Sequence, residues 1–225
     1  MNVQKMLLTP NQYSRPQIAI GTIKKIVVHW VGNAGSTAIN NRNYFEGLKA
    51  GANKVYASSH YIVGLEGEII QCIPEDEVAY HANSANNYSI GIENCHPDWD
   101  GKFNDLTYKS LIALCADLCY RYKLNPEMDV IRHYDVTGKM CPLYYVKNIT
   151  AWKQLKKDVL DVYNQLVMDA SSLITTITIN LNGTLKEVKR ILYNGQNYVK
   201  LRDLEDSHIS IGYDLTTKTP IIQVK

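Results

Sequence analysis

The chain has 225 residues, of which 45% are hydrophobic and 20% charged, so it can bury a substantial core and is typical of a globular protein. Its formal net charge of +2, with no run of lysines or arginines, argues against a nucleic-acid partner. No stretch is apolar enough to span a membrane, and the N-terminal residues lack the apolar core of a signal peptide, so we expect synthesis in the cytoplasm.

The first third of the chain predicts alternating strands and helices. Residues 24–30 form a β-branched run that is typical of a buried strand, and residues 37–50 predict a helix that ends before a glycine. Residues 59–63 and 68–73 are two further strand candidates separated by a Glu-Gly turn. This arrangement predicts a hairpin.

The middle of the chain continues the alternation. Residues 88–93 and 130–133 predict strands, and residues 107–122 predict a helix capped by Thr107, with apolar side chains at helical spacing. A second amphipathic helix is expected over residues 152–167. Strands interleaved with helices predict an α/β domain whose mixed central sheet is flanked by helices.

The sequence changes character near residue 170, so we expect a domain over residues 1–169 and a small β-rich domain over residues 171–225. The second segment carries three short strand candidates and two hairpin-type turns, namely residues 174–179, 198–201 and 221–224, with Asn182-Gly183 and Asn194-Gly195. A domain this small is near the lower size limit for independent folding, and docking or oligomerisation often stabilises such modules.

Three residues of the first domain indicate a metal site. His29 ends an apolar strand, His133 follows another, and Cys141 lies eight residues further on in a segment with loop composition. Each residue alone is more typical of core packing. Together, two imidazoles and a thiolate suit tetrahedral Zn²⁺ and leave a fourth position open, as catalytic zinc sites do.

Five motifs then occur in order along the chain: IVVHW (26–30), SSHYIV (58–63), AYHA (79–82), SIGIEN (89–94) and IRHYD with GKMCP (131–135 and 138–142). This set resembles the type-2 N-acetylmuramoyl-L-alanine amidases, which include phage endolysins and share a fold with peptidoglycan recognition proteins. The resemblance covers roughly residues 10 to 165. It implies an amidase/peptidoglycan recognition protein-like fold and a hydrolase that cleaves the bond between N-acetylmuramic acid and L-alanine in peptidoglycan.

The resemblance also implies roles for single residues. The zinc ligands of the family match His29, His133 and Cys141. Glu93 matches the carboxylate that takes a proton from the attacking water, and Lys139 matches a basic residue that stabilises the oxyanion. His60 and His81 fall in matching motifs and are assigned to substrate binding, with His81 facing the substrate.

Several alternatives stay open at this level. The domain is either an enzyme or a non-catalytic peptidoglycan-binding module, and a cysteine hydrolase with Cys141 as nucleophile is a further possibility. A phage endolysin is favoured over a bacterial autolysin, which more often carries an export signal. The C-terminal segment is read as a domain that binds a cell-wall polymer, with assembly of a homo-oligomer as its rival.

Overall fold

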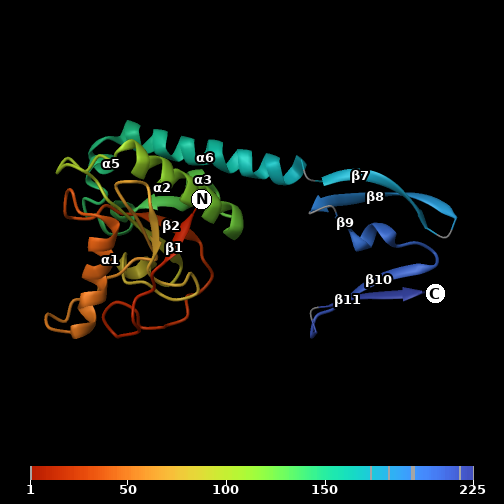
Figure 1. Cartoon of the computed structure of the whole chain (residues 1–225), viewed down its shortest axis with the longest axis horizontal. Coiled ribbons are helices and arrows are strands. Elements are labelled where there is room, and N and C mark those ends of the chain that lie inside the picture. Colours follow the sequence, from red (N-terminus) through yellow and green to blue (C-terminus); the bar gives the residue numbers. More distant parts are fainter. Residues whose placement is uncertain (1, 173, 182, 194–195, 218, 225) are drawn as a thin grey trace. The chain divides into compact units, whose positions relative to one another are not determined.

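The computed structural model describes residues 2–172, 174–181, 183–193, 196–217 and 219–224. It divides into two compact units, Met1–Leu166 and Val167–Lys225. The first unit contains a six-stranded mixed sheet in the order β1-β4-β3-β5-β2-β6 (Figure 1). Its strands are β1 (Val3–Lys5), β2 (Lys25–Val28), β3 (Tyr61–Val63), β4 (Ile69–Gln71), β5 (Ser89–Asn94) and β6 (Val130–Arg132).

Three longer helices cover the two faces of this sheet. They are α1 (Ala38–Gly47), α2 (Asp105–Tyr122) and α6 (Ile149–Ser172), which begins in the first unit and ends in the second. Shorter helical segments are η1 (Leu48–Ala50), η2 (Asn83–Ala85), α3 (Pro126–Asp129), α4 (His133–Thr137) and α5 (Leu143–Lys147). The mixed sheet flanked by helices confirms the predicted fold class.

The period of two along the strands decides which helix meets which face. Ile26 and Val28 of β2 point into one core with Leu111 of α2 and Leu155 of α6. Ile62 of β3 points the other way, into a second core completed by Ala38 and Phe45 of α1. All but one residue of each of the central strands β2 and β5 are buried, which explains their near-continuous apolar sequence.

Parallel pairing places the carboxyl ends of β2, β5 and β6 on the same side of the sheet. β2 pairs in parallel with β5 on one side and with β6 on the other, so Val28 lies opposite both Ile92 and Arg132. Residues that directly follow β2 and β6 therefore come close together. His29 and His133 therefore lie beside the carboxyl end of β5.

Some elements differ from the sequence prediction. Strand β1 was not predicted, because only three residues pair, in parallel with β4. Helix α2 starts two residues early: Asn104 caps it by accepting a hydrogen bond from the Thr107 amide, while the Thr107 hydroxyl donates to the Gly64 carbonyl instead. Helix α6 begins at Ile149 and continues to Ser172, beyond the amphipathic stretch that predicted it.

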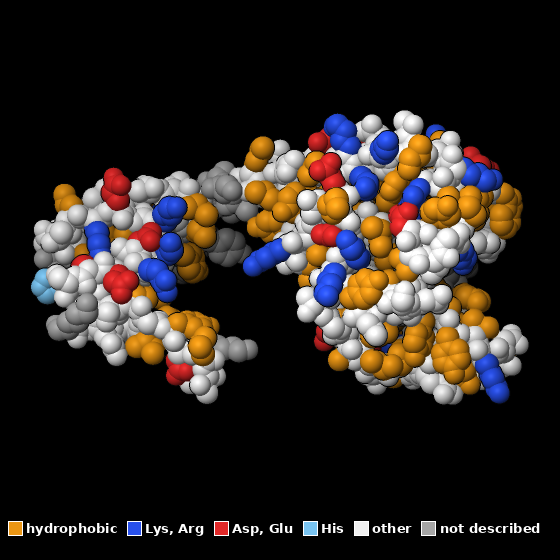
Figure 2. Space-filling model, turned by 180° about the vertical axis from the view of Figure 1, so that it is seen from behind, with side chains coloured by type: hydrophobic (Ala, Val, Ile, Leu, Met, Phe, Trp, Pro, Cys, Tyr) orange, Lys and Arg blue, Asp and Glu red, His pale blue; other side chains and the backbone are white. Residues whose placement is uncertain are grey.

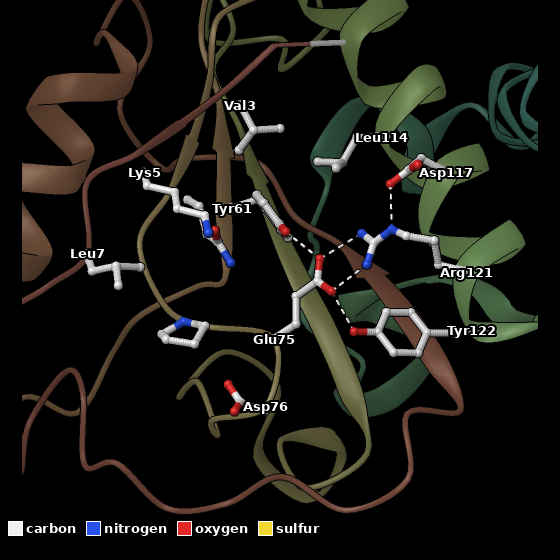
Figure 3. A pocket seen from close by; sticks show the side chains of 12 residues that line it. Val3, Lys5, Leu7, Tyr61, Glu75, Asp76, Leu114, Asp117, Arg121 and Tyr122 are labelled. Carbon is white, nitrogen blue, oxygen red and sulfur yellow. Dashed lines mark hydrogen bonds and ion pairs between the residues drawn. The ribbon is translucent and has the colours of Figure 1, made fainter. Parts of the chain in front are cut away.

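A hollow of about 490 Å³ lies beside the sheet edge formed by β1, and Figure 3 shows its polar wall. The Glu75 carboxylate points to the centre of that wall, where it accepts hydrogen bonds from the Tyr61 and Tyr122 hydroxyls and pairs with the Arg121 guanidinium. The Glu75 carboxylate therefore links Tyr61 of β3 to Arg121 and Tyr122 of α2.

The second unit is built from β-strands. Its three-stranded sheet contains β7 (Ile174–Leu181), β8 (Thr184–Tyr193) and β9 (Gln196–Val199), and the 3₁₀ turn η3 (Leu201–Leu204) precedes a hairpin of β10 (Ile209–Asp214) and β11 (Thr219–Val224). Of the predicted turn dipeptides, Asn194-Gly195 and Asn182 lie outside the described residues. Among the side chains described in this unit, Val188 is the one apolar residue that is fully buried.

Surface charge is mixed, and a membrane-crossing helix is not found. Figure 2 shows lysine and arginine side chains interspersed with acidic and apolar ones over the face drawn there. None of the described helices combines the length and the apolar character needed to cross a bilayer.

Candidate active site

His29 is fixed at the buried end of the central strand β2. Its backbone amide donates to the Ile92 carbonyl (2.8 Å), and its carbonyl accepts from the Asn94 side-chain amide (2.8 Å). Only 1% of the residue is exposed. Burial lowers the pKa of His29 well below its ordinary value, with His81 and His133 as further causes, so the ring is neutral and keeps one nitrogen lone pair.

His133 is brought beside His29 by the parallel pairing of β2 and β6. The two ring centroids lie 4.7 Å apart. Asp135 fixes the start of α4 just after the strand, because its carboxylate accepts a hydrogen bond from the Arg132 amide and binds the Arg132 guanidinium. Burial lowers the pKa of His133 to about 4, and the positive charge of Lys139 acts in the same direction.

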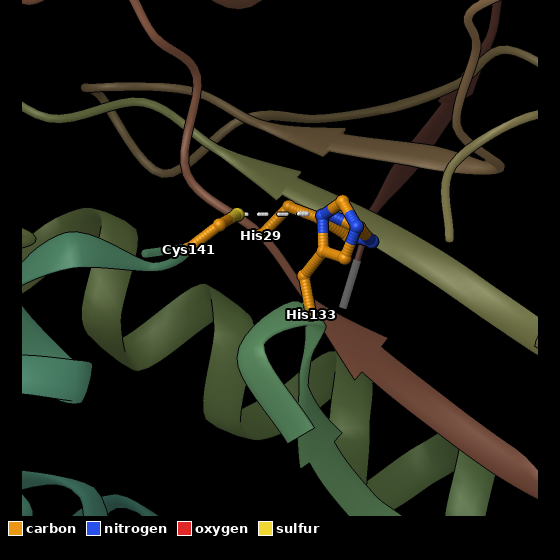
Figure 4. A group of neighbouring side chains, drawn as sticks. All are labelled: His29, His133 and Cys141. Carbon is orange, nitrogen blue, oxygen red and sulfur yellow. Dashed lines mark hydrogen bonds between the residues drawn. The ribbon is translucent and has the colours of Figure 1, made fainter. Parts of the chain in front are cut away.

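Cys141 reaches the two histidines from the segment after α4. Gly138 ends that helix in the left-handed region, with φ 77°, and the Tyr134 amide donates to the Cys141 carbonyl (2.9 Å). The sulfur lies 3.7 Å from Nδ1 of His29. Figure 4 shows the three side chains converging from β2, α4 and the following segment.

These three side chains fit a tetrahedral metal ion. One ligand atom from each of His29, His133 and Cys141 lies within 4.8 Å of the other two. Ligands at 2.0–2.3 Å from a tetrahedral Zn²⁺ are themselves about 3.3–3.8 Å apart, so the 3.7 Å separation of sulfur and Nδ1 matches. Moreover, Nδ1 of His133 is buried without any hydrogen-bond partner, as expected for a nitrogen reserved for a metal.

Glu93 provides a carboxylate in the same cavity. It lies near the end of β5, and its Oε2 atom is buried with no hydrogen-bond partner. Burial raises the pKa of Glu93 to about 8, although the positive charge of Lys139 opposes this rise. A buried carboxyl group with a free oxygen and a pKa near neutrality is suited to accept and return a proton.

The cavity around these groups has a volume of about 290 Å³. Lys139 is exposed at its edge, so its ammonium group is available to a bound anion or oxyanion. The remaining wall comes from segments between the strands: Trp30, Tyr56, Ala57, Ser58, Tyr80, His81, Asn83 and Asn86. The larger hollow beside Glu75 contains neither a histidine nor a cysteine in its wall, so the smaller cavity is the candidate active site.

The structure separates the two histidines that were assigned to the substrate. His81 lines the cavity, with Nδ1 3.0 Å from Nε2 of His29. His60 is fully buried; one ring nitrogen accepts from the Gly91 amide (3.0 Å) and the other lies 2.9 Å from the Glu77 carbonyl. Both ring nitrogens of His60 thus lie against β5 and the segment after β4 rather than in the cavity wall, and its assignment to substrate binding stays a prediction.

Other residues of the site were not found by sequence reasoning. Asn94 ends the SIGIEN motif, and its side-chain amide donates to the His29 carbonyl, a contact that the motif does not indicate. Tyr56, Asn83 and Asn86 line the cavity from irregular segments, where no periodicity marks a residue's direction.

Comparisons with known proteins identify relatives of this chain. Residues 20–143 match a family model described as N-acetylmuramoyl-L-alanine amidase. A probable N-acetylmuramoyl-L-alanine amidase of Bacillus licheniformis is 33% identical over 91% of this chain and 58% of its own length, so the chain spans less than two thirds of that relative.

Solved structures also resemble this chain. The catalytic domain of XlyA is 26% identical with a TM-score of 0.59, covering 71% of this chain and 99% of that domain. A mutant endolysin from Bacillus subtilis is also 26% identical, with a TM-score of 0.58, and covers 70% of this chain and 98% of its own.

Proposed function

The chain belongs to the N-acetylmuramoyl-L-alanine amidase family, and we propose that it hydrolyses the amide bond between N-acetylmuramic acid and L-alanine in bacterial peptidoglycan. The observation that carries this proposal is the convergence of His29, His133 and Cys141 beside the buried carboxyl group of Glu93 in one cavity. A protein that only bound peptidoglycan would not need a metal-type donor set next to a proton acceptor.

We assign the metal as zinc, held by His29, His133 and Cys141, because two imidazoles and a thiolate are ligands that zinc prefers. Zinc in this position would polarise the scissile carbonyl and make a water molecule more acidic. Glu93 takes the proton from the attacking water and returns it to the departing alanine nitrogen. Lys139, exposed at the edge of the cavity, offsets the negative charge that develops on the carbonyl oxygen.

The cavity walls bind the substrate around the scissile bond. His81 contributes to that wall, and the open side of the cavity admits a polymer that is far larger than 290 Å³. Resemblance to an endolysin structure supports a role in lysis of a phage host, with the enzyme made in the cytoplasm and acting on the wall once the membrane is permeabilised.

Mass spectrometry of purified cell walls digested with the protein tests the activity. We expect new free amino groups of alanine and no new reducing sugar ends, and new reducing ends without free alanine would identify a glycosidase instead. Digestion should stop with a chelator and resume with added Zn²⁺. Activity that persists in chelator but is lost on thiol alkylation would favour a cysteine hydrolase with Cys141 as nucleophile.

We propose that the second unit anchors the enzyme to a cell-wall polymer. A tethered anchor raises the local concentration of the enzyme at its substrate. A chain of residues 1–169 should therefore cleave small soluble wall fragments as the full chain does, but act weakly on intact walls. Sedimentation with purified walls and light scattering decide between wall binding and assembly of a homo-oligomer. If residues 171–225 do not sediment with walls and the full chain is dimeric, the second unit is an assembly module.

A further inference from the structure

The two ring nitrogens of His29 face two different partners. Nδ1 lies 3.7 Å from the sulfur of Cys141, on the side where the three candidate ligands converge. Nε2 lies 3.0 Å from Nδ1 of His81. A neutral imidazole carries a proton on one nitrogen and a lone pair on the other, so His29 offers a lone pair to a metal through Nδ1 only if Nε2 carries the proton.

The hydrogen bonds on the far side of His81 determine where the protons lie. Nε2 of His81 is 3.4 Å from the Ser89 carbonyl oxygen and 3.3 Å from the Ser89 hydroxyl. That hydroxyl donates its proton to the Ala85 carbonyl, 2.6 Å away. Both Ser89 atoms are therefore acceptors toward His81, and Nε2 of His81 must be the protonated nitrogen. Nδ1 of His81 is then an acceptor, which requires the proton between the two rings to belong to Nε2 of His29.

Packing holds the His81 ring in this orientation. The ring lies against Gly91 of β5, where a Cβ atom would come within 2.5 Å of His81 Cγ. The Asn86 side-chain oxygen accepts hydrogen bonds from the His81 amide (3.1 Å) and the Ala82 amide (2.7 Å), which fixes the backbone of this segment. The rings of His29 and His81 meet edge to face at 86°.

We propose that His81 is a positioning residue for the metal: its Nδ1 accepts a hydrogen bond from the protonated Nε2 of His29 and so reserves the Nδ1 lone pair of His29 for the ion. Ligating histidines commonly donate their other ring proton to an oxygen acceptor; here a second imidazole takes that place. The inference rests on the proposed metal site, and it gives His81 a task beyond forming the cavity wall.

Metal affinity of two similarly shaped variants tests the role of His81. His81→Asn places a carbonyl oxygen near the position of Nδ1 and keeps the acceptor, whereas His81→Leu removes it. Competition for Zn²⁺ against a chromogenic chelator should show a loss of about 10–100-fold in affinity for His81→Leu. His81→Asn should restore most of it. Tyr80→Phe, which removes another polar atom from the same wall without touching His29, should bind Zn²⁺ as the wild type does.

These outcomes separate the inference from the proposed function. If the wild type binds no metal, the proposed site fails; if the wild type binds Zn²⁺ and His81→Leu binds it equally well, the role of His81 fails. Equal losses in His81→Asn and His81→Leu would likewise show a packing effect rather than a hydrogen bond.

Nuclear magnetic resonance of the metal-free wild type gives a second test that needs no variant. Two-bond ¹H–¹⁵N correlations distinguish the two neutral tautomers of an imidazole. The ring of His29 should carry its proton on Nε2 before any metal is added. A proton on Nδ1 of His29 would overturn the inference.

Discussion

Replacing Glu75 with glutamine should destabilise the first unit at neutral pH and have almost no effect at strongly acidic pH. The Arg121 guanidinium binds both carboxylate oxygens of Glu75, at 2.6 and 2.7 Å, and the Tyr61 and Tyr122 hydroxyls donate to the same group. Although burial opposes ionisation, these bonds lower the pKa of Glu75 from 4.5 to about 2. Glutamine keeps one acceptor oxygen, so only one of the two tyrosine hydroxyls retains its acceptor, and the negative charge is lost.

The size of the effect follows from this pKa change. A decrease from 4.5 to about 2 corresponds to about 3 kcal/mol of stabilisation if none of it is screened. The Arg121 side chain is 40% exposed, so solvent reduces the value, and we expect Glu75→Gln to cost about 1–2 kcal/mol at pH 7. Because the folded-state pKa is depressed, this contribution is complete above pH 4.5 and disappears as the pH falls toward 2.

Urea unfolding of the metal-free proteins, followed by tryptophan fluorescence, measures the effect. All three tryptophans (Trp30, Trp99 and Trp152) lie in the first unit, so the signal reports on that unit alone. Chelator removes the metal whose release at low pH would confuse the comparison. Glu46, whose pKa is also lowered to about 2, is present in both proteins and cancels in the difference.

A matched control comes from the same arginine. Asp117 pairs with Arg121 across one helical turn, with its side chain 35% exposed, so Asp117→Asn should cost only about 0.3–0.5 kcal/mol. If the difference between wild type and Glu75→Gln were the same at pH 3 as at pH 7, the carboxylate charge would not be its cause. Equal costs for Glu75→Gln and Asp117→Asn would refute the argument from burial.

Further predictions concern the candidate active site. Glu93→Gln should keep bound zinc but reduce turnover by about 10²–10⁴-fold in a wall-digestion assay, and a loss below about tenfold would assign the proton transfer to another group. Cys141→Ser should lower the zinc content found by metal analysis, since a hydroxyl is a poor substitute for a thiolate; equal content would remove Cys141 from the ligand set. Lys139→Ala should reduce turnover less than Glu93→Gln does, with Lys147→Ala, outside the cavity wall, as a control that leaves it unchanged.

Sequence reasoning found the fold class because the strongest strands and helices carry their own signals. The apolar run of β2 and the spacing of apolar residues in α2 follow from the burial of these elements in the core. Strand β1 gave no such signal: only three residues pair, and two of them are exposed. The start of α2 was misplaced because Asn104 and Thr107 are both good capping residues, and only the position of the Gly64 carbonyl shows which of them points inward.

The second unit shows where periodicity stops being informative. Residues 174–179 alternate with threonines and residues 221–224 are an apolar run, and both predict strands that the structure contains as β7 and β11. Alternation does not state what an apolar face packs against, however, and Ile222 and Val224 of β11 remain largely exposed. A two-stranded hairpin is marginally stable by itself, so this unit gains from any surface that covers it. Either a wall polymer or a second copy of the chain could cover the exposed apolar side chains of this unit. Sedimentation detects the first and light scattering the second, so both measurements are required.

His60 and His81 show why a motif does not define a role within a site. Both are histidines in matching motifs, and both are assigned to substrate binding on that ground. The Gly91 amide donates a hydrogen bond to Nδ1 of His60, so this lone pair is already engaged within the sheet. The His81 ring packs against Gly91 and reaches His29, where the proposed tautomers make its Nδ1 the acceptor of a hydrogen bond from Nε2 of His29. The difference lies in which group stands in front of each ring nitrogen, the Gly91 amide for His60 and the His29 ring for His81, and the local sequence indicates neither contact.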